Sequence, residues 1–188
     1  MERRRIRRHL LVAAALRDVL NVEPVVVGGT AEELHSGAEY HEPDLDVCGW
    51  LQHGEGTVLR RLGFRKRGRH WFHEPSRVAV EFPDSRIDGD EDRIERIRVS
   101  SGTAAVIGVD DLYLDRLRQA TVPLHVEGGV EYHSALAVAA GAHDRIDRRY
   151  VLRRIREIER EDPMLGARMR SLDSRIRRRV SRALRGAT

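Results

Sequence analysis

The chain has 188 residues, with 34 lysine and arginine residues against 30 aspartate and glutamate residues, and a formal net charge of +4. This length fits one domain, or a compact domain with an extension, and the single cysteine excludes an intramolecular disulfide and a multi-cysteine zinc site. No apolar run reaches membrane-spanning length and the start of the chain lacks the apolar core of a secretory signal, so we expect a cytoplasmic protein without a membrane partner.

The chain begins with a predicted helix and a predicted strand. Apolar residues recur at helical spacing over residues 4–20, which indicates an amphipathic helix. An apolar strand over residues 25–27 then runs into a Gly-Gly pair at 28–29. Thr30 and Glu33 match a capping box, in which the hydroxyl accepts from a backbone N–H while the glutamate reaches back. We therefore expect a short helix just after the glycines, with its positive end toward the next strand.

That next strand, predicted over residues 44–51, carries two aspartates one residue apart. Alternate residues of a strand point to the same face, so Asp44 and Asp46 project together while the intervening apolar residues face the core. Two carboxylates beside a glycine turn with free N–H groups suit a divalent metal ion and a polyphosphate. Cys48 shares this face, where we interpret it as a small packed apolar residue, with a nucleophilic role as the alternative. His41, in the preceding loop, either touches a substrate phosphate or is a plain loop residue.

A β-hairpin is predicted further along, with strands over residues 70–73 and 77–82. Glu81 is the single acid among apolar neighbours in its second strand. His70 and His73 are three residues apart and therefore face opposite sides of the strand, which favours surface histidines over a zinc pair.

A basic cluster comes just before the hairpin and consists of Arg65, Lys66, Arg67 and Arg69. Cations of this kind hold the β- and γ-phosphates of nucleotides in phosphoryl-transfer sites. The same residues would equally suit a solvated basic turn, so the sequence leaves both interpretations open.

The remaining elements are mainly helical. We expect strands over residues 93–99 and 103–107, and helices near residues 58–62, 110–119, 132–140, 148–159 and 164–184. Together these elements predict an α+β fold with a small mixed β-sheet flanked by helices and a helical C-terminal part. We divide the chain into a domain over residues 1–120 and a helical extension over residues 121–188 that packs on it.

The last predicted helix has two contrasting faces. One face is an apolar stripe that we expect to pack on the body of the protein, formed by Met169, Leu172, Ile176, Val180 and Leu184. The other carries arginines that suit RNA, DNA or an acidic partner protein, namely Arg170, Arg175, Arg177, Arg178 and Arg179. Lys66 is the only lysine of the chain, a bias typical of GC-rich genomes, so arginine abundance alone does not indicate nucleic-acid binding.

The order of these motifs resembles the nucleotidyltransferase superfamily. Its signature is an apolar strand, Gly-Gly or Gly-Ser, a spacer and then Asp-x-Asp, with a third carboxylate on a later strand that pairs with the aspartate strand. The likeness covers about residues 25–117. Two features depart from the pattern: the spacer is longer than usual, and Glu42-Pro43 stands where relatives often place threonine or serine.

This resemblance implies an activity and a set of site residues. The activity would be metal-dependent transfer of a nucleoside monophosphate from an NTP to a hydroxyl of RNA, protein or a small molecule. Asp44, Asp46 and Glu81 would be catalytic and would hold Mg²⁺ or Mn²⁺. The NTP would be held by Gly28, Gly29, Thr30, Lys66 and Arg116.

Some small bacterial proteins of this kind belong to toxin–antitoxin or abortive-infection systems, which would imply a cognate toxin or antitoxin partner. The alternative is a non-catalytic module that keeps the fold and contacts nucleic acid or a partner protein through its arginine-rich helices.

Overall fold

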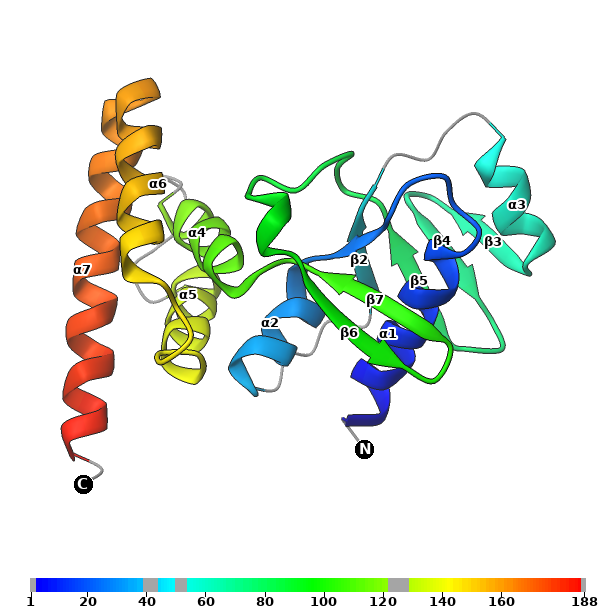
Figure 1. The fold of residues 1–188 in the computed structure, drawn as a ribbon, viewed down its shortest axis with the longest axis horizontal. Coiled ribbons are helices and arrows are strands. Elements are labelled where there is room, and N and C mark those ends of the chain that lie inside the picture. The colour runs from blue at the N-terminus through cyan, green and yellow to red at the C-terminus, as the bar shows by residue number, and fades with distance from the viewer. Residues whose placement is uncertain (1–2, 39–43, 50–53, 122–128, 187–188) are drawn as a thin grey trace. The chain divides into compact units, whose positions relative to one another are not determined.

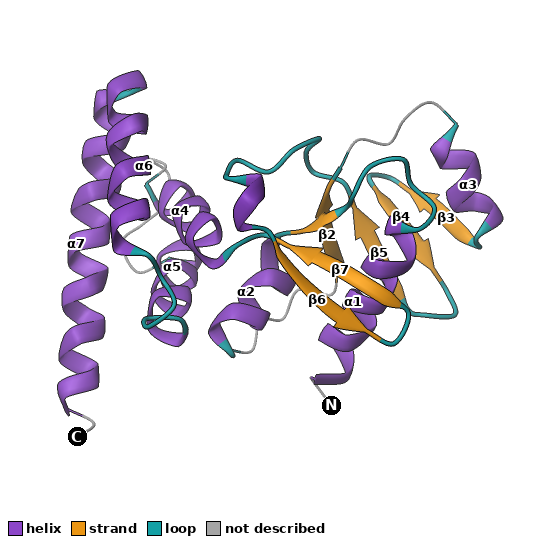
Figure 2. Ribbon diagram, viewed as in Figure 1, coloured by secondary structure: helices purple, strands orange, loops and turns teal. Residues whose placement is uncertain are grey.

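The computed structural model describes residues 3–38, 44–49, 54–121 and 129–186. The chain forms two compact units. The first comprises Met1–Leu34 and Glu39–Gly108, and the second comprises His35–Ala38 and Val109–Thr188. The main boundary between the units lies between Gly108 and Val109, whereas the boundary predicted from the sequence lies between residues 120 and 121. Figures 1 and 2 show the elements of each unit.

The first unit contains a mixed β-sheet of seven strands, ordered β3-β4-β5-β2-β1-β7-β6. Its strands are β1 (Val25–Val26), β2 (Asp44–Cys48), β3 (Phe64–Arg67), β4 (His70–His73), β5 (Val78–Glu81), β6 (Glu95–Val99) and β7 (Gly102–Val106). The pairs β1–β7 and β2–β5 are parallel and the other neighbours are antiparallel. The predicted α+β class is confirmed.

One face of this sheet is apolar and is covered by helices. Leu45, Val80 and Trp71 lie on it and are at most 4% exposed. Helix α1 (Arg3–Arg17) packs on this face. The Cβ of Ala14 lies 3.9 Å from the position that a Cβ would occupy at Gly102 of β7. Helix α3 (Glu55–Arg61) packs beside β3 and covers the Trp71 ring. The opposite face of the strands therefore holds the polar residues of the alternating pattern.

Helix α2 (Gly28–Ser36) begins earlier than the sequence pattern indicates. Because the helix starts at Gly28, Thr30 and Glu33 lie inside it, and the predicted capping box is wrong. The Thr30 hydroxyl instead shares a 2.7 Å hydrogen bond with Nδ1 of His9, and Glu33 forms an ion pair with Arg5. A one-turn helix, η1 (Glu91–Arg93), precedes β6.

The second unit is helical, with α4 (Val109–Ala120), α5 (Val130–Gly141), α6 (Arg148–Glu161) and α7 (Pro163–Gly186). All four predicted helices are confirmed. Two buried hydrogen bonds link them: Tyr113 donates to Asp173 at 2.9 Å, and Tyr150 donates to Asp111 at 2.6 Å. Burial and the Asp173 carboxylate raise the pKa of Tyr113, which therefore stays a hydrogen-bond donor.

The apolar stripe of α7 is buried in this unit over most of its length, since Met169, Leu172, Ile176 and Val180 are at most 6% exposed. Leu184 is the exception at 43% exposed, so its predicted place in the stripe is wrong. None of the helices in the described part of the chain is both long and apolar enough to cross a bilayer.

Candidate active site

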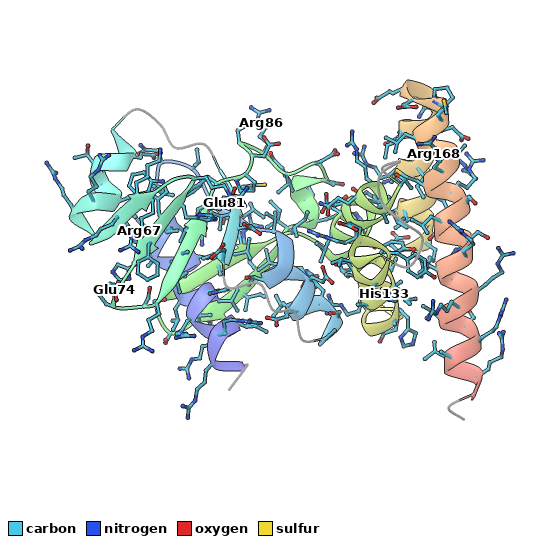
Figure 3. The ribbon with its side chains drawn as sticks, turned by 180° about the vertical axis from the view of Figure 1, so that it is seen from behind. Arg67, Glu74, Glu81, Arg86, His133 and Arg168 are labelled. Atoms are coloured by element: carbon cyan, nitrogen blue, oxygen red, sulfur yellow. The ribbon has the colours of Figure 1, made fainter. Side chains whose placement is uncertain are left out.

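Three carboxylates share the uncovered face of strands β2 and β5. Asp46 lies in register with Glu81, and Asp44 lies two residues before Asp46 on the same strand. Registered neighbours in a parallel pair point to the same face, so all three side chains project together. Each is half-buried, while Leu45 and Val80 beneath them are at most 1% exposed. The predicted pairing of the Glu81 strand with the aspartate strand is confirmed (Figure 3).

The turn at Gly28 places the start of α2 against Asp46. Gly28 has a φ of 61°, and a Cβ added there would lie 2.3 Å from Oδ2 of Asp46. The backbone N–H of Val27 also donates to the Asp46 carbonyl at 2.9 Å. Only glycine combines this backbone conformation with such a close approach. The first backbone N–H groups of an α-helix have no carbonyl partner within that helix. At α2 these groups lie beside the Asp46 carboxylate.

Thr30 contributes its backbone to this turn but not its hydroxyl. Its side chain is 4% exposed and is engaged by His9, which is itself 2% exposed. Burial, reinforced by Arg5 and Arg8, lowers the pKa of His9 to about 4, so the imidazole is neutral at physiological pH. The predicted phosphate contact is therefore restricted to the N–H of Thr30.

Two further residues contact the carboxylates. Nε2 of His70 lies 3.3 Å from Oδ2 of Asp44 and 3.1 Å from Oε2 of Glu81, although neither approach is aligned as a hydrogen bond. The exposed Arg69 forms an ion pair with the same Glu81 oxygen, at 3.1 Å from its Nε. The His70 side chain is 28% exposed, so it lies at the surface as predicted, and it also contacts both carboxylates. The predicted turn at residues 74–76 pairs His70 with Val80, whereas the observed turn is one residue longer and brings His70 opposite Glu81.

His73 does face the other side, as its spacing from His70 predicts. Its Nδ1 lies 2.8 Å from the Ser76 hydroxyl, and its ring stacks on Phe64 with centroids 4.7 Å apart. The two histidines therefore cannot share a metal ion.

The basic cluster divides between the two faces of β3. Lys66 is registered with Trp71, and its Nζ lies 5.6 Å from the centre of that ring on the helix-covered face. The structure therefore does not bring Lys66 to the carboxylates. Arg67 lies on the carboxylate face, with its guanidinium 5.4 Å from the centre of the Phe72 ring, and Arg65 shares that face (Figure 3).

Comparison with solved structures identifies the fold. A crystal structure of an antigenic nucleotidyltransferase-like protein from Paracoccidioides brasiliensis superposes with a TM-score of 0.54 at 12% identity, covering 88% of this chain and 92% of that one. The protein has a nucleotidyltransferase-like fold. A weaker likeness links it to JHP933 from Helicobacter pylori, with a TM-score of 0.48, 11% identity and coverage of 94% and 93%. No protein-family model matches the chain, and no curated protein matches it.

Not every predicted residue of the nucleotidyltransferase-like site lies in the first unit. Arg116 belongs to α4 of the second unit, where it lies 3.1 Å from Asp115 and donates to Gln119 at 3.1 Å. Its contact with a nucleotide stays a prediction. Cys48 is 7% exposed, in keeping with a packed residue. His41 and Glu42-Pro43 lie outside the described residues.

The carboxylate set fits a magnesium ion in its chemistry. Carboxylate oxygens are the ligands that Mg²⁺ prefers, and Gly28 places backbone without a side chain against Asp46. Within the described residues, no group of three or more His, Cys, Asp and Glu side chains is placed so that it could hold a metal ion by itself. Mg²⁺ is ordinarily held by one or two carboxylates with substrate phosphates and water, so such a group is not required.

Proposed function

We propose that the first unit binds a nucleoside triphosphate with a divalent metal ion on the carboxylate face and transfers the nucleoside monophosphate to a hydroxyl acceptor. The observation that supports this most is the register of Asp46 with Glu81, with Asp44 on the same face and the Gly28 turn against Asp46. Acidic residues on a rigid sheet beside the N-terminal backbone N–H groups of a helix offer a metal site next to a phosphate site.

Each part of this face has a role in the proposal. Asp44, Asp46 and Glu81 would hold one or two Mg²⁺ or Mn²⁺ ions, which stabilise the charge on the attacking and leaving oxygens. The backbone N–H groups of Gly28, Gly29 and Thr30 would hold phosphate oxygens. Arg67 and Arg69, which lie on the carboxylate side, would take the phosphate-binding role that Lys66 cannot fill.

In the transfer step, the acceptor oxygen forms a bond to the α-phosphorus while the bond from that phosphorus to the bridging oxygen breaks. Pyrophosphate leaves with the bonding electrons. The acceptor hydroxyl loses its proton to Glu81, or to water if Glu81 instead completes the metal set. His70, in contact with both Asp44 and Glu81, holds the two carboxylates in place between strands.

A second candidate is a binding module without catalysis. The observation that favours it is the ion pair of Arg69 with Glu81, since a cation at a carboxylate competes with a metal ion. Membership of a toxin–antitoxin pair is compatible with both candidates, and the neighbouring genes would test it.

A labelling experiment separates the two candidates. The full chain is incubated with each α-phosphate-labelled NTP, Mg²⁺ or Mn²⁺, and total RNA, so that both RNA and the chain itself are available as acceptors. The proposal predicts label on one acceptor with the wild type and none with Glu81→Gln. Asp84→Asn and Asp88→Asn, which change exposed acids beyond β5, are matched controls that should retain transfer. Full transfer by all three variants would leave Glu81 as a structural residue only.

A further inference from the structure

The second unit carries a row of exposed arginines on its last helix. We call it the α7 arginine face, and it comprises Arg168, Arg178, Arg179 and Arg182. At 3.6 residues per turn, these positions lie along one side of the helix. At 1.5 Å of rise per residue, the row extends over about 21 Å.

Carboxylates of its own helix do not neutralise this face. Residues 174–186 contain no aspartate or glutamate, and Asp173, the single acid of α7, is 1% exposed. Asp173 accepts hydrogen bonds from Tyr113 and from Arg177, so the Arg177 charge is paired with this buried carboxylate.

The neighbouring helix α6 offers a comparison within the same protein. It has three glutamates beside six arginines, and Arg154 lies 2.7 Å from Glu157. Glu159 of α6 also pairs with Arg170 of α7. A genome-wide bias toward arginine would affect both helices alike, so the excess of charge on α7 needs a separate explanation.

The face is also held in place. Met169, Ile176 and Val180 anchor the buried side of α7, and the guanidinium of Arg179 lies over the Tyr132 ring of α5, 5.9 Å from its centre. The helix backbone is therefore fixed, and the contact with Tyr132 reduces the side-chain entropy that Arg179 loses on binding.

We propose that the α7 arginine face binds the sugar–phosphate backbone of double-stranded nucleic acid without reading its bases. Four guanidiniums over about 21 Å can each meet a phosphate of one duplex strand, in which phosphates follow one another about every 3.4 Å. Each guanidinium can donate two parallel hydrogen bonds to a phosphate.

Two alternative ligands fit the face less well. Proteins that hold single strands stack bases on aromatic side chains, and α7 contains no aromatic residue. Helices that lie on membranes insert apolar side chains, but the apolar stripe of α7 is buried within its own unit. The proposal goes beyond nucleotidyl transfer and does not depend on it, because a variant without transfer would still bind the duplex.

The test measures binding of the full chain to a labelled RNA duplex and a labelled DNA duplex over a series of salt concentrations. Single-stranded RNA, anionic phospholipid vesicles and a polyglutamate peptide are the competing ligands. The triple substitution Arg178→Gln, Arg179→Gln and Arg182→Gln removes charge but keeps the buried stripe and the Arg177–Asp173 pair. A matched control makes the same charge change on the exposed positions of α6, with Arg149→Gln, Arg156→Gln and Arg160→Gln. Circular dichroism checks that both variants keep their helices.

The proposal predicts that the wild type binds one or both duplexes more tightly than every competing ligand, with a log–log salt slope of about −4. The triple substitution on α7 should reduce the slope by about 2 to 3 and weaken binding at least tenfold near ~0.1 M salt, while the control changes binding less than about threefold. The proposal is overturned if the wild type does not bind duplexes at low salt, if the two variants lose affinity equally, or if single strands, vesicles or polyglutamate bind more tightly. A preference for one duplex over the other would identify the ligand as RNA or DNA.

Discussion

At the scale of single residues, Gly28 is the position where backbone geometry and site chemistry depend on each other most directly. Its φ of 61° and the 2.3 Å that would separate a Cβ from Oδ2 of Asp46 both exclude a side chain. Gly28→Ala should lower the free energy of unfolding by about 1–2 kcal/mol and also displace the Asp46 carboxylate. We therefore expect it to reduce the binding of a metal-bound nucleotide as well as stability.

Gly37→Ala is the matched control for this prediction. Gly37 has a φ of 67° but no atom within 4 Å of an added Cβ, so its substitution carries the backbone strain alone. Chemical denaturation and nucleotide titration of both variants separate the two effects. Equal nucleotide binding by the two variants would show that Gly28 has no part in the site.

His9 predicts a pH dependence of stability. Burial lowers its pKa to about 4 in the folded protein, against 6.5 for the unperturbed group, so the unfolded chain binds a proton that the folded chain does not between these values. Stability should consequently fall as the pH decreases from about 6.5 toward 4, by an amount on the order of 2–3 kcal/mol at most.

His9→Asn removes this titration while keeping a polar group near Thr30. Denaturation curves of wild type and variant from pH 7 to pH 4.5 give the comparison, and the wild type should lose more stability than the variant over this interval. Parallel losses in both proteins would assign the acid sensitivity to other groups.

At the scale of secondary-structure elements, long helices were predicted well because each carries a continuous apolar stripe. Helix α6, predicted over residues 148–159, spans Arg148–Glu161. Strand β3 was missed because Phe64 is its only buried residue and the three basic residues that follow are exposed, which is typical of a charged edge strand. The start of α2 was misplaced because a glycine with positive φ, rather than a capping side chain, begins it.

The site residues likewise divide into those that a local sequence pattern predicts and those that depend on strand pairing. The alternation of side chains along β2 predicts the common face of Asp44 and Asp46, and a single acid in an apolar strand predicts Glu81. The contacts of His70 and Arg69 with the carboxylates were not predicted, because they depend on the pairing of β4 with β5, which is a non-local register. Lys66 was assigned to the site because of its charge. Its position within β3 instead places its side chain on the helix-covered face.

The buried stripe of α7 provides a prediction at this scale. Ile176 is fully buried, and Ile176→Ala should lower the free energy of unfolding by about 2–4 kcal/mol through lost burial and a residual cavity. Leu184, 43% exposed on the same helix, is the matched control, and Leu184→Ala should change it by less than about 1 kcal/mol. Denaturant melts of both variants measure the difference. A comparable loss in both would mean that the stripe extends through Leu184 as the sequence predicts.

At the scale of the whole molecule, the proposed functions are divided between the two compact units. The carboxylates, the Gly28 turn and the basic residues of the carboxylate face belong to the first unit, and the α7 arginine face belongs to the second. Each unit has its own buried core, with Val26 and Leu45 in the first and Tyr150 and Ile176 in the second. The two proposals can therefore be tested separately in the full chain.

The most direct test of the central claim is the thermal stabilisation of the full chain by Mg²⁺ with a non-hydrolysable NTP, compared between the wild type and Asp46→Asn. The variant removes one carboxylate charge from a cluster, so without ligand it should be as stable as the wild type or slightly more stable. The account predicts an increase in melting temperature on ligand addition for the wild type and for the control Asp84→Asn, and none for Asp46→Asn. Equal increases in the wild type and Asp46→Asn would contradict the assignment of the carboxylate face as the nucleotide and metal site.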